Sequence, residues 1–459
     1  MAEESPRSTN HSRRRHRPEP SSRKERAAPA VNADTLEGRW GGMQQWLVAG
    51  IAFLLGFLAV FNFNVIGVLG LNEVFLVAIA PFFAWKMYKS RTLRRQKWVL
   101  WLGLIYLAAQ MGSDWYRGSV PQDYLRGWSR IAITILTFCI ASALFVRNTK
   151  AVLAFIIGAF LVGPISFYQQ GAIADEELVY KMSFGLAVSL ASFLLVTLVP
   201  SRLKLPMSAA PVLAGVFALW RGGRGLAGIT VMAVVTYWAG RIRAGGFKRL
   251  SRMRIFQIAC VVGVAGWGIF ETYRYTASHG ILGEAALEKY ELQAKQISGS
   301  FSVVSGRQEV LFSGPKIMAS PIVGWGSWPK DFDYVYDRAV ALGLELPSAE
   351  PSAVSPEVGL IPSHSHFFTA WLEAGVAGGC FWGVAVYMAV AVLLRQKFHR
   401  HEQLAPILNY LIVLFLWDVF FSPYSGERRV WNGVILAVIA ATYYKNKDET
   451  QSSPVRRAT

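Results

Sequence analysis

The residues best suited to chemistry in this chain are arginines that stand beside glycine. Arg221 and Arg224 flank a two-glycine turn, and Arg307 follows Ser-Gly in a later hydrophilic segment. A guanidinium is always charged and presents a planar fork of N–H donors that matches phosphate oxygens. Glycine neighbours allow a ligand to approach the backbone closely. These three arginines therefore indicate a site for a phosphate or diphosphate group.

Further arginines lie at the edges of apolar runs. Arg428 and Arg429 precede the last run, and Arg117, Arg126 and Arg130 surround the end of the third. We expect Arg428 and Arg429 to contact the same anion. For each arginine taken alone, the alternative is a residue at the membrane interface that binds no ligand. Such a side chain packs its aliphatic part against apolar surface and extends its charge into water.

Two histidines and a glutamate follow Pro362. Pro362 and Ser363 indicate a helix start with Ser363 as N-cap, which places His364 in the first helical turn. The positive end of a helix dipole favours the neutral imidazole that a general base requires. His366 and Glu373 are about two turns apart and share a helix face. We expect His364 to be the base and His366 and Glu373 to contact substrate.

A metal or redox centre has little support in the sequence. His364 and His366 could bind a metal, but no cysteine or carboxylate at ligand spacing completes the set. Cys139, Cys260 and Cys380 all lie inside apolar runs, so neither a disulfide framework nor a thiolate site is indicated. We therefore expect no metal ion and no cofactor.

The 459 residues that must position these groups are too apolar for a soluble protein. Hydrophobic residues make up 53% of the chain and charged residues 17%, against about 25% charged residues in typical soluble domains. A net charge of +18 is typical of nucleic-acid binders, but here it coexists with apolar runs of membrane-spanning length. The composition excludes a soluble nucleic-acid binder, a disordered protein and a disulfide-stapled secreted scaffold.

Apolar runs recur along the chain, and most approach the roughly 20 residues that a helix needs to cross a bilayer. They lie at residues 44–62, 66–86, 98–112, 131–146, 151–168, 182–200, 207–220, 225–240, 255–273, 366–394, 405–421 and 430–444. We predict an all-α, polytopic membrane protein with about twelve transmembrane helices and one large external loop.

Basic residues gather in alternate connections between the runs, above all at 86–97 and 241–254. The positive-inside rule places these connections and both termini in the cytoplasm. From the N-terminus, we predict a disordered basic cytoplasmic tail at 1–42, nine transmembrane helices at 43–273, a large periplasmic loop at 274–362, three helices at 363–445 and a cytoplasmic tail at 446–459. A loop of this length on a compact scaffold is usually functional.

Two acidic residues lie inside predicted transmembrane helices, Glu73 in the second and Asp418 in the eleventh. A charge within a bilayer is costly, so each must serve a polar substrate or have a partner. Pairing with a neighbouring arginine or lysine and a role toward substrate are both open from the sequence.

The histidine segment resembles the signature of the O-antigen ligase and polymerase family. In that signature a His-Ser pair is followed, after nine residues, by Gly-x-x-Gly, as in His364, Ser365, Gly375 and Gly378. The same residues read on their own indicate a base followed by glycines that permit tight helix packing.

The arginines also resemble that family. Gly223-Arg224-Gly225 is similar to one characteristic arginine, and Ser305-Gly306-Arg307 followed by Pro321-Ile-Val-Gly-Trp-Gly326 is similar to the stretch before the histidine. The similarity covers about residues 220–380. Leu311 stands where members often have tryptophan, which leaves the subfamily and the acceptor open.

The resemblance implies a GT-C-like, metal-independent glycosyltransferase of the bacterial inner membrane. Such proteins move a glycan from an undecaprenyl diphosphate carrier to a sugar hydroxyl on the periplasmic side. It implies that Arg224 and Arg307 hold the diphosphate and that His364 activates the acceptor. The acceptor is a growing glycan for a polymerase and the lipid A core for a ligase, and both stay open.

Two other function classes are possible. A transporter or flippase of lipid-linked oligosaccharide predicts internal repeats and helices broken in corresponding halves, and the sequence shows no convincing repeat. An envelope scaffold would use the basic tail and the loop for partners, and it leaves the His364 motif unexplained.

Overall fold

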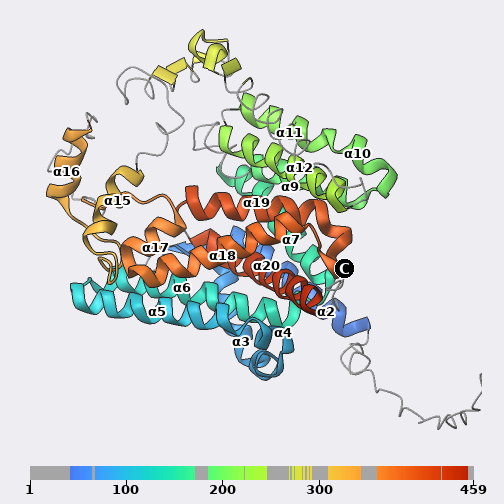
Figure 1. Cartoon of the computed structure of the whole chain (residues 1–459), viewed down its shortest axis with the longest axis horizontal. Coiled ribbons are helices and arrows are strands. Elements are labelled where there is room, and N and C mark those ends of the chain that lie inside the picture. The colour runs from blue at the N-terminus through green and yellow to red at the C-terminus, as the bar shows by residue number, and fades with distance from the viewer. Residues whose placement is uncertain are drawn as a thin grey trace, which may run out of the picture. The chain divides into compact units, whose positions relative to one another are not determined.

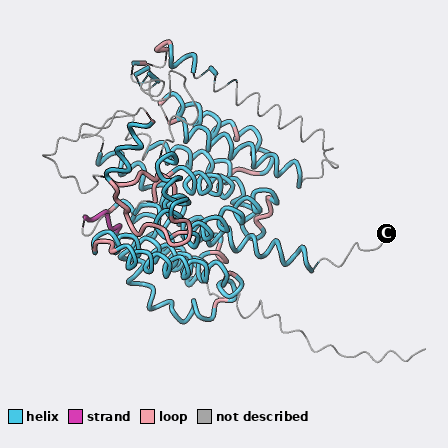
Figure 2. The backbone as a smooth tube through the Cα atoms, turned by 60° about the vertical axis from the view of Figure 1, so that its left-hand side comes forward, coloured by secondary structure: helices cyan, strands magenta, loops and turns pink. Residues whose placement is uncertain are grey.

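The computed structural model describes most of the chain from Gly42 onward and is predominantly helical (Figures 1 and 2). The described residues are 42–64, 68–170, 184–221, 223–244, 309–342, 359–424 and 426–452, with scattered residues between 268 and 291. Within them one antiparallel hairpin joins β1 (Asn62–Asn64) to β2 (Val68–Gly70), with Phe63 opposite Leu69. The predicted helical class is confirmed.

The longer helices in chain order are α2 (Gly42–Phe57), α3 (Leu71–Lys89), α5 (Lys97–Arg117), α6 (Pro121–Ile140), α7 (Thr149–Gln170), α9 (Gly185–Leu198), α11 (Ala209–Trp220), α12 (Arg224–Ala244), α15 (Glu309–Ala319), α16 (Phe332–Ala341), α17 (His366–Ala374), α18 (Val376–Arg395), α19 (Ala405–Phe421) and α20 (Gly426–Ser452). Shorter elements are η1 (Leu58–Val60), α4 (Arg91–Arg95), the π-helical turn η2 (Ala141–Phe145), η4 (Ser201–Leu203), α10 (Lys204–Met207) and η5 (His399–Leu404). Each predicted apolar run coincides with one or two of these helices, except 255–273, most of which lies outside the described residues.

Five helical stretches within the described residues are long and apolar enough to cross a membrane. They are Pro121–Phe145, Ser201–Trp220, Arg224–Ile242, Val376–Arg395 and His401–Phe421, and three shorter apolar helices are Gln44–Val60, Thr149–Ile165 and Gly185–Leu198. Length and composition thus indicate a membrane protein. The number of about twelve spans stays a prediction.

α19 is the central helix of the bundle. It packs against α9, α12, α17, α18 and α20 (Figure 1). Asn409 of α19 fixes its register on α12, because its Nδ2 donates to the carbonyl oxygen of Ala233 at 2.7 Å and to Oγ1 of Thr236 at 2.8 Å. A buried amide with both donors used resists sliding of one helix along the other.

The basic connections meet at one end of the bundle. Hydrogen bonds run from Arg147 Nε to Thr92 Oγ1 (2.7 Å), between His401 Nε2 and the Val146 carbonyl (2.7 Å), and from Asn446 Nδ2 to the Lys397 carbonyl (3.3 Å). Connections that face the same side of a membrane must share one end, so this arrangement is compatible with their predicted placement on one side. Which side that end faces stays a prediction.

α2 and α7 cross with their backbones in contact at Gly56 and Gly158. A Cβ added to Gly56 would lie 2.7 Å from the amide nitrogen of Ala159, and one added to Gly158 would overlap the carbonyl of Phe53. Small residues at such crossings are typical of membrane helices, where close packing replaces the hydrophobic drive for association.

We predict that Gly56→Ala or Gly158→Ala lowers stability by about 1–3 kcal/mol, because each methyl group forces the helices apart. Gly50→Ala is the matched control, since Gly50 is on α2 and has no atom within 4 Å of an added Cβ. Its substitution should be neutral or stabilising. Thermal unfolding of the purified protein in detergent measures all three, and equal midpoints would contradict the contact.

Candidate functional site

Ser365, and not Ser363, caps α17. Its Oγ accepts a hydrogen bond from the amide of Phe368 at 3.1 Å and donates to the carbonyl of Val419 at 2.9 Å. The predicted cap at Ser363 was wrong because this second bond, to α19, fixes Ser365 at the helix start. His364 therefore precedes the helix and lies in the loop that leads to it.

The His364 side chain is exposed and stands beside a carboxylate. Its Nδ1 lies 3.3 Å from Oε1 of Glu309, the first residue of α15, and the imidazole is 54% exposed against 27% for the carboxylate. α15 packs on α17, which brings the two residues together. An accessible imidazole with one nitrogen next to a carboxylate has the arrangement that a general base needs.

His366 lies in a different environment. It is fully buried, with its ring 5.2 Å from that of Trp382 in a stacked arrangement and 4.7 Å from that of Tyr424 edge-on. Its Nε2 is 3.3 Å from the carbonyl oxygen of Pro423. A substrate could reach His366 only if these rings moved, so its predicted contact with substrate has no support from its position.

Arg428 and Arg429 of α20 are both in ion pairs. Arg428 NH1 is 2.6 Å from Asp418 Oδ2, and Arg429 NH1 is 3.2 Å from both carboxylate oxygens of Glu73. Of the two readings that the sequence left open for Glu73 and Asp418, the structure confirms pairing with arginine. These pairs hold α20 to α19 and to α3. The side chain of Arg428 is 28% exposed, whereas that of Arg429 is 9% exposed.

Arg221 and Arg224 occupy the tight turn between α11 and α12. Arg221 follows the last residue of α11 and Arg224 is the first of α12, and both are half-buried. The turn is closed by the amide of Gly223, which donates to the carbonyl of Ala218 at 2.7 Å. Arg307, the third predicted arginine, lies outside the described residues.

The ends that carry Arg224 and His364 reach α19 at the same level. Gly225 abuts Trp417, since an added Cβ would lie 2.8 Å from the indole Cζ2. Ser365 bonds to Val419, two residues further along α19. Two residues of helix rise about 3 Å and turn about 200° around the axis, so the two predicted functional segments reach the same level of α19 from different sides.

The loop between α15 and α16 is locked onto the turn between α17 and α18 by a pair of glycines. Gly324 has φ +83° and Gly375 has φ +63°. A Cβ on Gly324 would lie 2.6 Å from the amide nitrogen of Gly375, and one on Gly375 would lie 2.8 Å from that of Val323. These glycines belong to the two sequence motifs near His364, so the motifs are in direct backbone contact.

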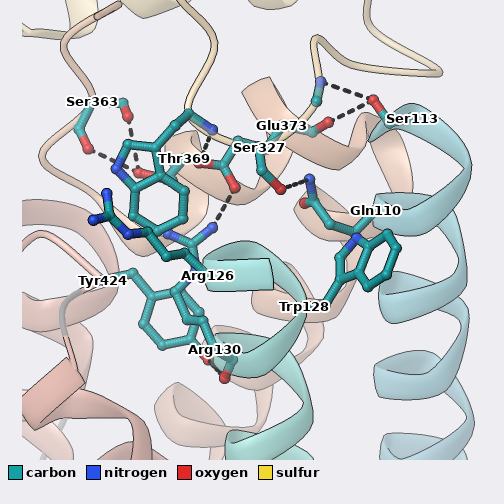
Figure 3. A network of polar contacts seen from close by, with 12 residues as sticks. Gln110, Ser113, Arg126, Trp128, Arg130, Ser327, Ser363, Thr369, Glu373 and Tyr424 are labelled. Carbon is teal, nitrogen blue, oxygen red and sulfur yellow. Dashed lines mark hydrogen bonds and ion pairs between the residues drawn. The ribbon is translucent and has the colours of Figure 1, made fainter. Parts of the chain in front are cut away.

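Hydrogen bonds also connect the loop between α15 and α16 to α5 (Figure 3). The amide of Gly326 donates to the carbonyl of Glu373 at 3.0 Å and to Ser113 Oγ at 2.9 Å. Asp114 accepts from the amide of Ser327 at 2.5 Å and from its hydroxyl at 2.8 Å. Trp128 Nε1 donates to the same carboxylate at 2.8 Å. Asp114 thus fixes the loop to α5 and α6.

A buried ion pair between Arg130 of α6 and Glu373 of α17 lies at the centre of this network (Figure 3). The two side chains are 3% and 4% exposed. The guanidinium of Arg130 lies over the rings of Trp328 (4.7 Å) and Tyr424 (4.9 Å). Glu373 Oε1 accepts from the amide of Trp328 at 3.4 Å. Both oxygens of Glu373, predicted to contact substrate, are therefore engaged within the protein.

Trp328 adopts a left-handed backbone conformation, with φ +49°. For a bulky residue this is a genuine outlier that persists only where the surroundings determine it. Its neighbours are fixed on both sides, by the bonds of Ser327 to Asp114 and by the amide of Ile361, which donates to the carbonyl of Pro329 at 3.0 Å. The strained residue joins the His364 segment to the ion pair.

α15 and α16 are linked by a salt bridge outside the apolar helices. Lys316 Nζ lies 2.5 Å from Asp331 Oδ2 and over the rings of Trp325 (4.5 Å) and Tyr334 (4.4 Å). The hydrogen bond from Lys316 holds the pKa of Asp331 below its usual value. Burial raises the pKa of Tyr334 above its ordinary value.

Asp114 and Ser327 are not identified by the sequence pattern, and Arg130 is identified only as one of the arginines at the edges of apolar runs. The available signal was a charge next to an apolar run, because Asp114 and Arg130 flank predicted helices where an unpaired charge is costly. Their partners are remote in the chain and leave no local pattern.

No protein family model matches the chain, and no curated protein matches it either. The resemblance to O-antigen ligases and polymerases therefore rests on the motifs of the chain itself.

We predict that Glu373→Gln and Arg130→Met each lower stability by about 3–5 kcal/mol, because each leaves one buried charge without its partner. The double variant Arg130→Met/Glu373→Gln removes both charges and should be more stable than either single variant. Thermal unfolding in detergent gives the comparison. A double variant as unstable as the sum of the two would contradict a coupled pair.

Proposed function

We propose that this protein is a membrane glycosyltransferase that transfers a glycan from an undecaprenyl diphosphate carrier to a sugar hydroxyl. The exposed imidazole of His364 carries the proposal, because it lies beside a carboxylate in a segment that meets α19 at the same level as the start of α12. A base close to cationic side chains is what glycosyl transfer from a diphosphate requires.

The donor site is proposed to consist of Arg224 and Arg307. Arg307 precedes Glu309 by two positions, and two residues of chain reach about 7 Å at most. Glu309 contacts His364, so the proposal places the diphosphate next to the base. Negative charge builds on the diphosphate as its bond to the anomeric carbon breaks, and guanidinium groups stabilise that charge.

Other arginines have lesser roles in this proposal. Arg221 lies in the same turn as Arg224, and the side chain of Arg428 keeps part of its surface accessible despite its pair with Asp418. Both are proposed to contribute positive electrostatic potential around the diphosphate of the donor. Arg429 is buried against Glu73, so it is proposed to hold α20 in place.

The bilayer and the periplasm complete the proposal. The lipid tail of the carrier lies in the membrane that the apolar helices indicate. His364 is proposed to lie on the periplasmic face of a bacterial inner membrane, because the positive-inside rule favours a cytoplasmic side for the basic connections. The acceptor is a glycan on the same carrier for a surface polysaccharide polymerase, and the lipid A core for an O-antigen ligase.

We predict that His364→Ala lowers the rate of glycan transfer by roughly 10²- to 10⁴-fold, the usual contribution of a positioned base. The assay uses purified protein in lipid vesicles with a labelled, lipid-diphosphate-linked glycan. His279→Ala is the control, since His279 is also exposed and its Nδ1 lies 2.8 Å from the carbonyl oxygen of Tyr275.

The product of that assay separates the remaining alternatives. Longer lipid-linked chains identify a polymerase, and glycan on a new acceptor identifies a ligase. Full activity of His364→Ala would overturn the role of the base. Movement of the unaltered lipid-linked glycan across the vesicle, with no product formed, would favour the flippase.

We predict that Arg224→Lys and Arg307→Lys each raise the KM for the lipid-linked donor at least tenfold. Lysine keeps the positive charge but loses the planar fork that binds two phosphate oxygens. Arg395→Lys is the control, because Arg395 ends α18 at the opposite end of the bundle. Donor affinity that is unchanged in both variants would argue against a bidentate diphosphate site.

A further inference from the structure

We propose that Glu309 is the positioning residue of His364, and that the base is the Nε2 atom of the imidazole. This inference rests on the proposed glycosyltransferase function. It deepens that function by assigning a role to a carboxylate outside the motifs and by naming the atom that receives the proton.

The geometry distinguishes the two ring nitrogens. Nδ1 is the atom that lies 3.3 Å from Glu309 Oε1. The imidazole is twice as exposed as the carboxylate, 54% against 27%, so the ring is accessible to a substrate. A carboxylate accepts hydrogen bonds, and in a neutral imidazole the nitrogen that faces it carries the proton. Nε2 then has the free lone pair.

The position of His364 is fixed from both directions along the chain. Three residues before it, Ile361 is buried in a cluster with Ile317 of α15. One residue after it, Ser365 is bonded to α19 through Val419. The contact with Glu309, which opens α15, is therefore set by packed elements. Such support is what keeps a catalytic group in one orientation.

In the proposed step, the acceptor hydroxyl gives its proton to Nε2 as its oxygen forms a bond to the anomeric carbon. The bond from that carbon to the diphosphate oxygen breaks, and its electron pair leaves with the undecaprenyl diphosphate. Nδ1 keeps its proton, so His364 becomes an imidazolium. The carboxylate of Glu309 stabilises that charge in the same way as the acidic member of a catalytic triad. The exposed ring then releases the proton to water.

If Glu309 acts through His364, its substitution should affect kcat much more than donor binding, which a purely structural role would not predict. Glu309→Ala should lower kcat by up to roughly 10²-fold, the lower end of what a positioned base contributes, with the KM for the lipid-linked donor changed by less than about twofold. Glu309→Gln should recover part of the rate, because its amide oxygen can still accept the Nδ1 proton. Introduced into His364→Ala, the Glu309→Ala change should cause no further loss. Asp333→Ala is the control, an exposed acid in the first turn of α16.

A second measurement does not depend on transfer. In ¹⁵N-histidine-labelled protein in lipid vesicles, with the His364→Gln spectrum for assignment, wild-type His364 should be the Nδ1–H tautomer. Glu309→Ala should shift it toward Nε2–H. If the wild type forms no product, the proposed function falls and the role of Glu309 falls with it. If the wild type forms product while Glu309→Ala keeps both the full kcat and the Nδ1–H tautomer, the role of Glu309 alone is overturned.

Discussion

The burial of Arg130 determines how the end of the bundle that carries His364 is built. A guanidinium removed from water needs an opposite charge and partners for its donors. Glu373 supplies the charge from α17, and the rings of Trp328 and Tyr424 cover the remaining surface. Each of these partners comes from a different element: Tyr424 from the turn between α19 and α20, Trp328 from the loop after α15, and Glu373 from α17. One buried charge therefore ties together the segments on either side of His364, which is itself left exposed.

The same requirement shapes the other charged residues of the apolar helices. Glu73 and Asp418 are each matched by an arginine at the start of α20. α20 is thereby held to α3 on one side and to α19 on the other, although apolar packing alone would allow it to slide or rotate. Buried ion pairs add little net stability, but they penalise every arrangement in which a partner is missing. In this protein they fix which helices are neighbours at the level of the proposed site.

The local sequence pattern was sufficient to predict the helices. It was not sufficient to predict the hydrogen bonds and ion pairs around Arg130, Glu373 and Asp114. Apolar runs predicted the helical elements because lipid-facing and buried positions are both apolar. The cost of a charge inside the bilayer predicted that Glu73 and Asp418 each need either a charged partner or a polar substrate. The choice of Ser365 over Ser363 as the cap depends on Val419, and the partner of Asp114 is 213 residues away in the chain. Only the packed structure determines these contacts. From the sequence alone, Ser363 and Ser365 are equally suitable caps, and nothing distinguishes Ser327 from other serines as the partner of Asp114.

The backbone contact between Gly324 and Gly375 has a consequence for how such a protein can change during evolution. Each glycine leaves room for the main chain of the other segment, and both have φ values that other residues rarely adopt. A substitution in either one cannot be compensated by trimming a neighbouring side chain, because the obstacle is backbone. We therefore expect the loop that contains Gly324 and the turn that contains Gly375 to change together during evolution. A recombinant that received the loop from a relative would need to receive the matching turn with it.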